Sequence, residues 1–192
     1  MVGKTIVIDN YDSFTYNLVQ MIEEFSGAEP DVIRNDEITP EGVSNYENII
    51  LSPGPGVPKE AGNLLSIIEH NYQNKKILGV CLGLQAIGEV FGSELENLPN
   101  VYHGIQSSIK RTEVNCPLFQ ELPEQIDVGR YHSWVIDKNK VGDDLLITSY
   151  DTQGEIMSAR HKDYSVYGVQ FHPESILTPS GKDIIANFFK HG

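Results

Sequence analysis

The stretch Ile77-Leu78-Gly79-Val80-Cys81-Leu82-Gly83-Leu84-Gln85-Ala86-Ile87 contains a strand, a sharp turn and the start of a helix. Residues 77–80 are apolar and typical of a buried strand, whereas the spacing of apolar residues in 82–91 favours a helix that ends before Gly92. Cys81 therefore lies where a strand turns into a helix. The glycines on either side tolerate the tight backbone of such a turn.

This position suits a cysteine nucleophile on a strand-to-helix elbow. The free N–H groups and the partial positive charge at the start of a helix favour a thiolate and stabilise an oxyanion. The same pentapeptide is also compatible with a buried core cysteine, because free cysteine is among the most buried residue types. The interpretation of Cys81 therefore depends on finding a base elsewhere in the chain.

Strand and helix patterns alternate through the first half of the chain. Ser13 is predicted to cap the first helix, and Thr39-Pro40 is predicted to open a short helix. The predicted strands are residues 5–9, 30–34, 48–51 and 76–80, and the predicted longer helices are residues 14–25, 64–72 and 82–91. Such alternation predicts a parallel sheet that is covered on both faces.

The second half of the chain consists mainly of strand patterns followed by one helix. The predicted strands are residues 107–114, 125–131, 134–137, 145–150, 155–161 and 166–171, and the predicted helix is residues 183–190. We therefore predict an α/β fold for a single domain, residues 1–192. It has an open, mostly parallel central sheet with helices on both faces and an antiparallel or mixed strand extension.

Composition and charge exclude several classes of protein. The net charge of −13 argues against a nucleic-acid partner, which requires a basic surface. The two cysteines do not form a disulfide framework, and the first residues lack a signal-peptide pattern, so we expect a cytoplasmic protein. The most apolar stretch, residues 77–91, is too short to cross a membrane. We expect His70, His161 and His191 at the surface.

His172-Pro173-Glu174 supplies the base that a cysteine nucleophile needs and the acid that orients the base. Pro173 disfavours a helix at His172, and in an extended segment residues two apart point to the same side. The segment directly follows a predicted strand, as Cys81 does, and sites in α/β sheets lie beyond the carboxyl ends of strands. We therefore expect these residues to meet Cys81.

A loop rich in proline and glycine, Ser52-Pro53-Gly54-Pro55-Gly56-Val57-Pro58, follows the third predicted strand. Its stiff backbone and exposed amides could form an oxyanion hole or hold a planar amide. Taken by itself, the pattern favours a rigid turn.

Three segments together resemble the class I (triad-type) glutamine amidotransferases. They are the elbow at residues 79–87, the loop at residues 52–56, and Gly168-Val169-Gln170-Phe171-His172-Pro173-Glu174-Ser175. Two more, Asp9-Asn10-Tyr11-Asp12-Ser13-Phe14-Thr15-Tyr16-Asn17 and Arg130-Tyr131-His132-Ser133, are similar to the chorismate-using branch of this family. The branch contains anthranilate synthase component II and the glutamine amidotransferase subunit of aminodeoxychorismate synthase. The chain departs from the branch at Leu84, where members usually carry His, and at Trp134, where a smaller aliphatic residue is common.

The resemblance implies a flavodoxin-like fold and a role for each matching residue. Cys81 would be the nucleophile, His172 the general base and acid, and Glu174 the orienting carboxylate. The backbone N–H groups of Gly54 and Leu82 would form the oxyanion hole. The glutamine substrate would be held by Gly54, Pro55, Gly56, Gln85, Ser133 and Trp134. No metal or cofactor is implied for this chain, and Mg²⁺ is expected in a partner subunit.

The resemblance also implies a partner, a large chorismate-binding synthase subunit that residues 9–17 would help to contact. The chain would hydrolyse L-glutamine through a Cys81 thioester and pass ammonia to anthranilate synthase, in tryptophan biosynthesis. The alternatives are the same role in aminodeoxychorismate synthase, in folate biosynthesis, or a subunit shared by both. Another hydrolase with a cysteine elbow and a non-catalytic, partner-binding subunit also remain open.

Overall fold

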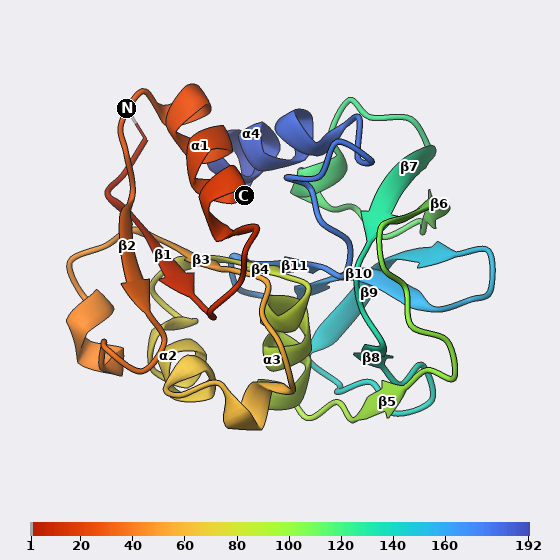
Figure 1. Ribbon diagram of the computed structural model, residues 1–192, viewed down its shortest axis with the longest axis horizontal. Helices are drawn as coiled ribbons and strands as arrows, with labels where there is room; N and C mark the ends of the chain where they lie inside the picture. The colour runs from red at the N-terminus through yellow and green to blue at the C-terminus, as the bar shows by residue number, and fades with distance from the viewer. Residues whose placement is uncertain (1) are drawn as a thin grey trace.

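A computed structural model describes residues 2–192, and its centre is a sheet of nine strands in the order β2-β1-β3-β4-β11-β10-β9-β6-β7 (Figure 1). Five neighbouring strands are parallel: β2 (Asp31–Arg34), β1 (Thr5–Asp9), β3 (Asn48–Leu51), β4 (Lys76–Val80) and β11 (Val166–Val169). The antiparallel extension contains β10 (Ile156–His161), β9 (Leu145–Asp151), β6 (Ile105–Arg111) and β7 (Gln125–Arg130). The predicted parallel sheet with its antiparallel extension is confirmed.

Helices cover both faces of the sheet, as the alternating sequence pattern predicts. Helices α1 (Thr15–Ser26) and α4 (Gly181–His191) lie on one face, and α2 (Leu64–Asn71) and α3 (Leu82–Val90) lie on the other (Figure 1). The short helix predicted after Thr39 is a 3₁₀ helix, Pro40–Val43, and the Thr39 side chain accepts the Gly42 N–H. Two further 3₁₀ helices, Pro58–Glu60 and Pro117–Phe119, were not predicted.

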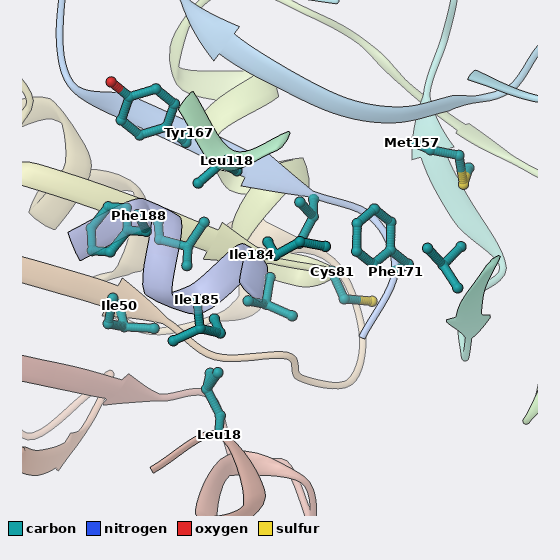
Figure 2. Packing of buried hydrophobic residues seen from close by; sticks show 14 of the residues in the cluster. Leu18, Ile50, Cys81, Leu118, Met157, Tyr167, Phe171, Ile184, Ile185 and Phe188 are labelled. Atoms are coloured by element: carbon teal, nitrogen blue, oxygen red, sulfur yellow. The ribbon is translucent and has the colours of Figure 1, made fainter. Parts of the chain in front are cut away.

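The hydrophobic core is divided between the two faces because neighbouring side chains of a strand point in opposite directions. Ile50 of β3 belongs to the cluster under α1 and α4, together with Leu18, Ile184 and Phe188 (Figure 2). Ile49 and Leu51 belong to the cluster under α2 and α3, which includes Leu64, Ile67, Leu82 and Ile87. All of these side chains are fully buried or nearly so. The continuous apolar strands therefore bury both of their faces, as a central parallel sheet requires.

Two local expectations are wrong, and one predicted strand is present but joins a different sheet. Ser13 is exposed and does not cap α1, since the Phe14 N–H instead donates to Asp12 Oδ1 at 2.8 Å in a local aspartate turn. The strand at Trp134 (β8, Trp134–Ile136) pairs with β5 (Leu95–Asn97) in a separate two-stranded sheet instead of extending the main one. His161 is buried among aromatic rings, and its Nδ1 accepts the backbone N–H groups of Asp163 and Tyr164. Its ring nitrogen is satisfied by a local turn, which is why burial is tolerated.

None of the helices in residues 2–192 has the length and apolar character needed to cross a membrane.

Candidate active site

Cys81 lies on a strained turn between β4 and α3. Its backbone has φ 53° and ψ −101°, which is uncommon for a residue other than glycine, and its N–H donates to the Val169 carbonyl at 2.8 Å. The turn is tight because β4 and α3 touch at Gly79, where a Cβ atom would collide with the backbone of Gly83, and a Cβ atom on Gly83 would in turn collide with Leu51 of β3. The flanking glycines therefore permit the close strand–helix contact that places Cys81 at the sheet edge.

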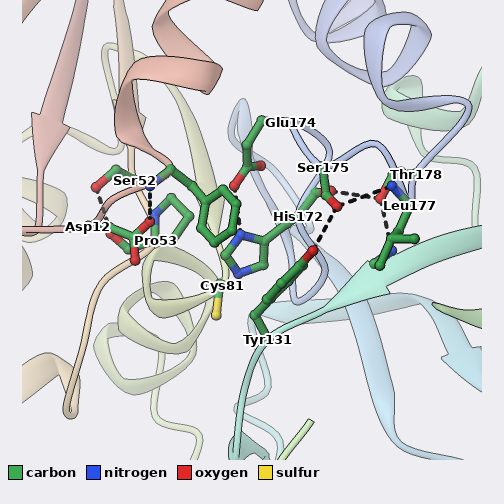
Figure 3. Close-up of polar contacts among 12 residues, drawn as sticks. Asp12, Ser52, Pro53, Cys81, Tyr131, His172, Glu174, Ser175, Leu177 and Thr178 are labelled. Atoms are coloured by element: carbon green, nitrogen blue, oxygen red, sulfur yellow. Dashed lines mark hydrogen bonds and ion pairs between the residues drawn. The ribbon is translucent and has the colours of Figure 1, made fainter. Parts of the chain in front are cut away.

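His172 and Glu174 lie at the same edge, three and five residues beyond the end of β11. Because β4 and β11 are adjacent and parallel, their carboxyl ends bring this segment to Cys81. His172 Nδ1 lies 2.6 Å from Glu174 Oε1, and both side chains are buried. The imidazole lies between the Glu174 carboxylate and the Cys81 sulfur (Figure 3). The structure thus brings the three predicted catalytic residues together.

The surroundings of His172 favour its protonated form. Burial lowers the pKa of His172, but the neighbouring Cys81 sulfur, when it carries negative charge, and the Glu174 carboxylate outweigh burial and raise the pKa to about 10. Nε2 of His172 has no hydrogen-bond partner within residues 2–192, even though Cys81 is near enough to contribute to this shift. The ring can therefore exchange a proton at Nε2 while Glu174 holds Nδ1.

Two aromatic rings that sequence reasoning did not assign to the site hold the imidazole. Tyr131 and Phe14 have ring centroids 4.8 and 5.5 Å from that of His172, and 5.0 Å from each other. The Tyr131 hydroxyl also lies 3.1 Å from Ser175 Oγ (Figure 3). Phe14 fits the apolar stripe of the first predicted helix, and Tyr131 belongs to the motif at residues 130–133, but neither pattern indicates contact with His172.

A pocket of about 180 Å³ opens beside Cys81. Seven of the predicted site residues line it: Gly54, Pro55, Gly56, Cys81, Gln85, Ser133 and Trp134. Five residues outside the predicted set also line it: Val101, Tyr102, His103, Tyr131 and His132. Leu82 does not line the pocket with its side chain, which is buried, but its N–H lies in the first turn of α3. Such N–H groups have no acceptor within their helix.

The proline–glycine loop is fixed against the neighbouring elements. Asn10 donates its backbone N–H to Ser52 Oγ and its side-chain amide to the Ser52 carbonyl, at 2.9 and 2.7 Å. A Cβ atom on Gly54 would lie within 2.8 Å of both Asn10 and Leu82, so this position requires glycine. The contact sets the Gly54 backbone beside the start of α3, where the sequence predicted an oxyanion hole.

A buried charged network supports the far wall of the pocket. Arg130 lies 2.5 Å from Asp151, its Cζ is 3.6 Å from the centroid of the Tyr102 ring, and its Nε donates to His132 Nε2 at 3.1 Å. Burial, and then the charges of Arg130 and His172, lower the pKa of His132 to about 3. His132 is therefore neutral near pH 7, with its proton on Nδ1.

Three further features complete the description of the site and its surroundings. Leu84 is fully buried against Gly168 and Ile136, so it forms part of the core beneath the elbow. In residues 2–192, no three His, Cys, Asp or Glu side chains come together as a possible metal site. Cys116 is a second free cysteine, buried in the core under α4.

Comparisons with known proteins agree on the family. The model of the family "Glutamine amidotransferase class-I" matches residues 6–191. Anthranilate synthase component 2 of Pseudomonas aeruginosa is 44% identical over 96% of this chain and 94% of its own length. A chloroplastic anthranilate synthase beta subunit 2 of rice is 46% identical over 96% of this chain and 70% of its own.

One solved crystal structure, from Thermoplasma acidophilum, is provisionally assigned as one of the subunits of GMP synthase. It matches this chain with a TM-score of 0.87 at 25% sequence identity, and the match covers 98% of this chain and 93% of that chain. The fold and the matched residues thus extend over almost the whole chain, not over the elbow alone. The chain belongs to the class-I glutamine amidotransferase family.

Proposed function

We propose that this chain is the glutaminase subunit of anthranilate synthase, acting in tryptophan biosynthesis in the cytoplasm. It hydrolyses L-glutamine through a γ-glutamyl thioester on Cys81 and passes the ammonia to a large chorismate-binding subunit. One observation carries the proposal: the buried His172–Glu174 pair, 2.6 Å apart, faces a cysteine on a strained elbow beside a pocket about the size of one amino acid. The names of the Pseudomonas and rice relatives support the choice of synthase.

In the first step, the Cys81 thiolate attacks the side-chain amide carbon of glutamine and forms a C–S bond. The N–H groups of Gly54 and Leu82 stabilise the resulting oxyanion. His172 gives its Nε2 proton to the amide nitrogen, the C–N bond breaks, and ammonia leaves. Glu174 holds Nδ1 throughout, so that Nε2 keeps facing the sulfur.

In the second step, neutral His172 takes a proton from a water molecule, whose oxygen attacks the thioester carbon. The C–S bond then breaks, glutamate leaves, and the thiolate is restored. Gln85, Ser133 and Trp134, with Pro55 and Gly56, hold the amino-acid end of the substrate along the pocket wall.

Exposed apolar side chains near the site support a partner surface. Ile176, Val101 and Tyr16 are 95, 74 and 67% exposed, and Tyr11 is 49% exposed. Ile176 follows Glu174 by two residues, Val101 lines the pocket, and Tyr11 and Tyr16 flank Phe14. Ammonia released into neutral water is mostly protonated to ammonium, which is not nucleophilic, so a closed path delivers ammonia to chorismate at a far lower total concentration than the solution would need. A synthase subunit docked on this surface would cover these side chains and close the path.

The test is product identity. The purified chain is mixed with the large subunit of anthranilate synthase or of aminodeoxychorismate synthase, and supplied with glutamine, chorismate and the Mg²⁺ that the partner needs. Glutamate and anthranilate should form with the first partner. Cys81→Ala should form no glutamate but should still bind that partner, and added ammonium salt should restore anthranilate.

The other outcomes assign the chain differently. Aminodeoxychorismate alone would assign it to folate biosynthesis, and both products would indicate a shared subunit. A complex that forms without any glutamate would indicate a non-catalytic subunit. Hydrolysis of peptides in place of glutamine would indicate another kind of cysteine hydrolase.

A further inference from the structure

Gln170 is the residue whose side chain donates a hydrogen bond to the sulfur of Cys81. Its Nε2 lies 3.5 Å from Sγ, and the residue is fully buried just beyond the end of β11. Its backbone N–H is fixed to the Met157 carbonyl at 2.8 Å. Within residues 2–192, His172 Nε2 forms no such bond. In residues 2–192, the group that donates a hydrogen bond to the sulfur is thus an amide, with His172 facing the same sulfur.

The orientation of this amide follows from its neighbours. Gln85 Nε2 lies 2.9 Å from the Trp134 backbone carbonyl, which can only accept, so that atom of Gln85 must be the amide nitrogen. The same nitrogen lies 3.3 Å from the nearer amide atom of Gln170, which must therefore be the oxygen. The remaining atom of the Gln170 amide, its nitrogen, is left to face Cys81.

We propose that Gln170 is a positioning residue for the nucleophile: its N–H donates to the Cys81 thiolate, and Gln85 fixes the direction of that donor from the pocket wall. This inference rests on the proposed function, because it concerns the same nucleophile. A hydrogen bond to a thiolate is stronger than one to a neutral thiol, and burial strengthens it further. Gln170 therefore favours the reactive form of Cys81 and holds it in place for attack.

Other groups that can carry charge also face this sulfur or its pocket. His172, backed by Glu174, approaches from the segment after β11. His132 and Tyr131 line the pocket from the segment after β7, and His103 lines it from the loop before β6. A substitution at Gln170 removes none of these groups, so a change in the pH dependence of Cys81 reactivity that the control variant does not share can be assigned to the amide.

The test is the rate at which iodoacetamide alkylates Cys81 between about pH 5 and pH 10. Peptide mass mapping separates Cys81 from the other free cysteine, Cys116. Gln170→Met keeps a side chain of similar length but has no donor. In this variant, the pH at which the alkylation rate of Cys81 reaches half of its maximum should rise by about one to two pH units. The kcat for glutamine should fall roughly 10- to 100-fold. Gln170→Glu should move the profile further, because it places a negative oxygen beside the sulfur.

Asn187→Leu is the matched control. It also removes a buried amide, which donates to the Leu118 and Gln120 carbonyls, and it should lower stability without moving the profile. If Gln170→Met does not fold, Gln85→Leu should move the profile in the same direction by a smaller amount, because it frees the Gln170 amide. If the alkylation rate of Cys81 depends on pH in the same way in the wild type and in every folded variant, the proposal is overturned. Alkylation needs no glutamine, so a wild-type chain that forms no glutamate would count against the proposed function alone.

Discussion

A Cβ atom on Gly79 would lie 2.4 Å from the carbonyl carbon of Gly83, so β4 and α3 touch at two residues that lack side chains. Both partners in this contact are backbone and cannot move aside as a flexible side chain could. The elbow that carries Cys81 therefore depends on Gly79 having no side chain, while the missing side chain of Gly83 lets the same helix lie against Leu51 of β3.

Gly79→Ala should lower the free energy of unfolding by about 3 kcal/mol, because the added methyl group overpacks the contact between strand and helix. Gly27→Ala is the control, since Gly27 has φ 72° and open space around it, and it should cost only about 1 kcal/mol of backbone strain. Urea denaturation measures both. Equal losses would show that the strand–helix contact yields more readily than the structure indicates.

The raised pKa of His172 should make stability fall as the pH rises. Burial lowers this pKa, but Cys81 and Glu174 raise it to about 10, above the ordinary value of 6.5. The folded state thus keeps a proton that the unfolded state releases. The stabilisation is complete below about pH 6.5 and is lost as the pH rises towards 10.

Urea denaturation at several pH values tests this expectation, with Glu174→Gln as the comparison. The variant lacks one of the two groups that raise the pKa, so its stability should depend less on pH over the same range. If the free energy of unfolding of the wild-type chain did not change between about pH 6.5 and 10, the expected protonation of His172 would be contradicted.

Neutral His132 should be visible directly. Burial, followed by the charges of Arg130 and His172, lowers the pKa of His132 to about 3. Because the unfolded chain takes up a proton at this histidine and the folded chain does not, the contribution of His132 to stability is complete above about pH 6.5 and is lost as the pH falls towards 3. In NMR spectra the ring resonances of His132 should therefore not titrate between about pH 5 and 8. Titration of His132 near pH 6.5 would refute this assignment.

Removing Asp151 should be costly, because Arg130 would keep its charge in a buried site. Both side chains are 1% exposed, so Asp151→Asn should lower stability by about 3–5 kcal/mol. Glu24→Gln breaks the exposed pair with Lys182, which water and salt screen, so it should lower stability far less than Asp151→Asn does. Calorimetry compares the two variants, and similar losses would mean that water reaches Arg130.

Tyr131 should act through its ring more than through its hydroxyl. Tyr131→Phe keeps the packing on His172 and loses the contact with Ser175, so kcat for glutamine should fall by only about threefold. Tyr131→Ala removes the ring and should lower kcat by roughly a hundredfold, because the imidazole is no longer held. If Phe and Ala variants lose the same activity, the hydroxyl is the important group.

Much of the fold could be predicted because its signals are local. Continuous apolar segments mark the parallel strands, and the spacing of apolar residues marks α1, α2 and α3. Strand β5 was not predicted because it is only three residues long and two of these residues are exposed and polar, so it has no hydrophobic pattern. It forms by pairing with β8. The burial of His161 was also missed, since the aromatic rings around it come from Tyr72 and Phe91, far away in the chain.

The sequence by itself determined the alternation of strands and helices, the strand-to-helix turn at Cys81, and the three residues predicted to carry the chemistry. These depend on neighbouring residues, on glycine and proline, and on motifs a few residues long. Only the tertiary structure decided that the rings of Phe14 and Tyr131 pack against His172. It also decided that the loop with Val101–His103 lines the pocket and that the Gln170 amide faces the Cys81 sulfur. Those contacts join segments up to 158 residues apart (172 minus 14), and no local pattern specifies which side chains meet when the sheet is assembled.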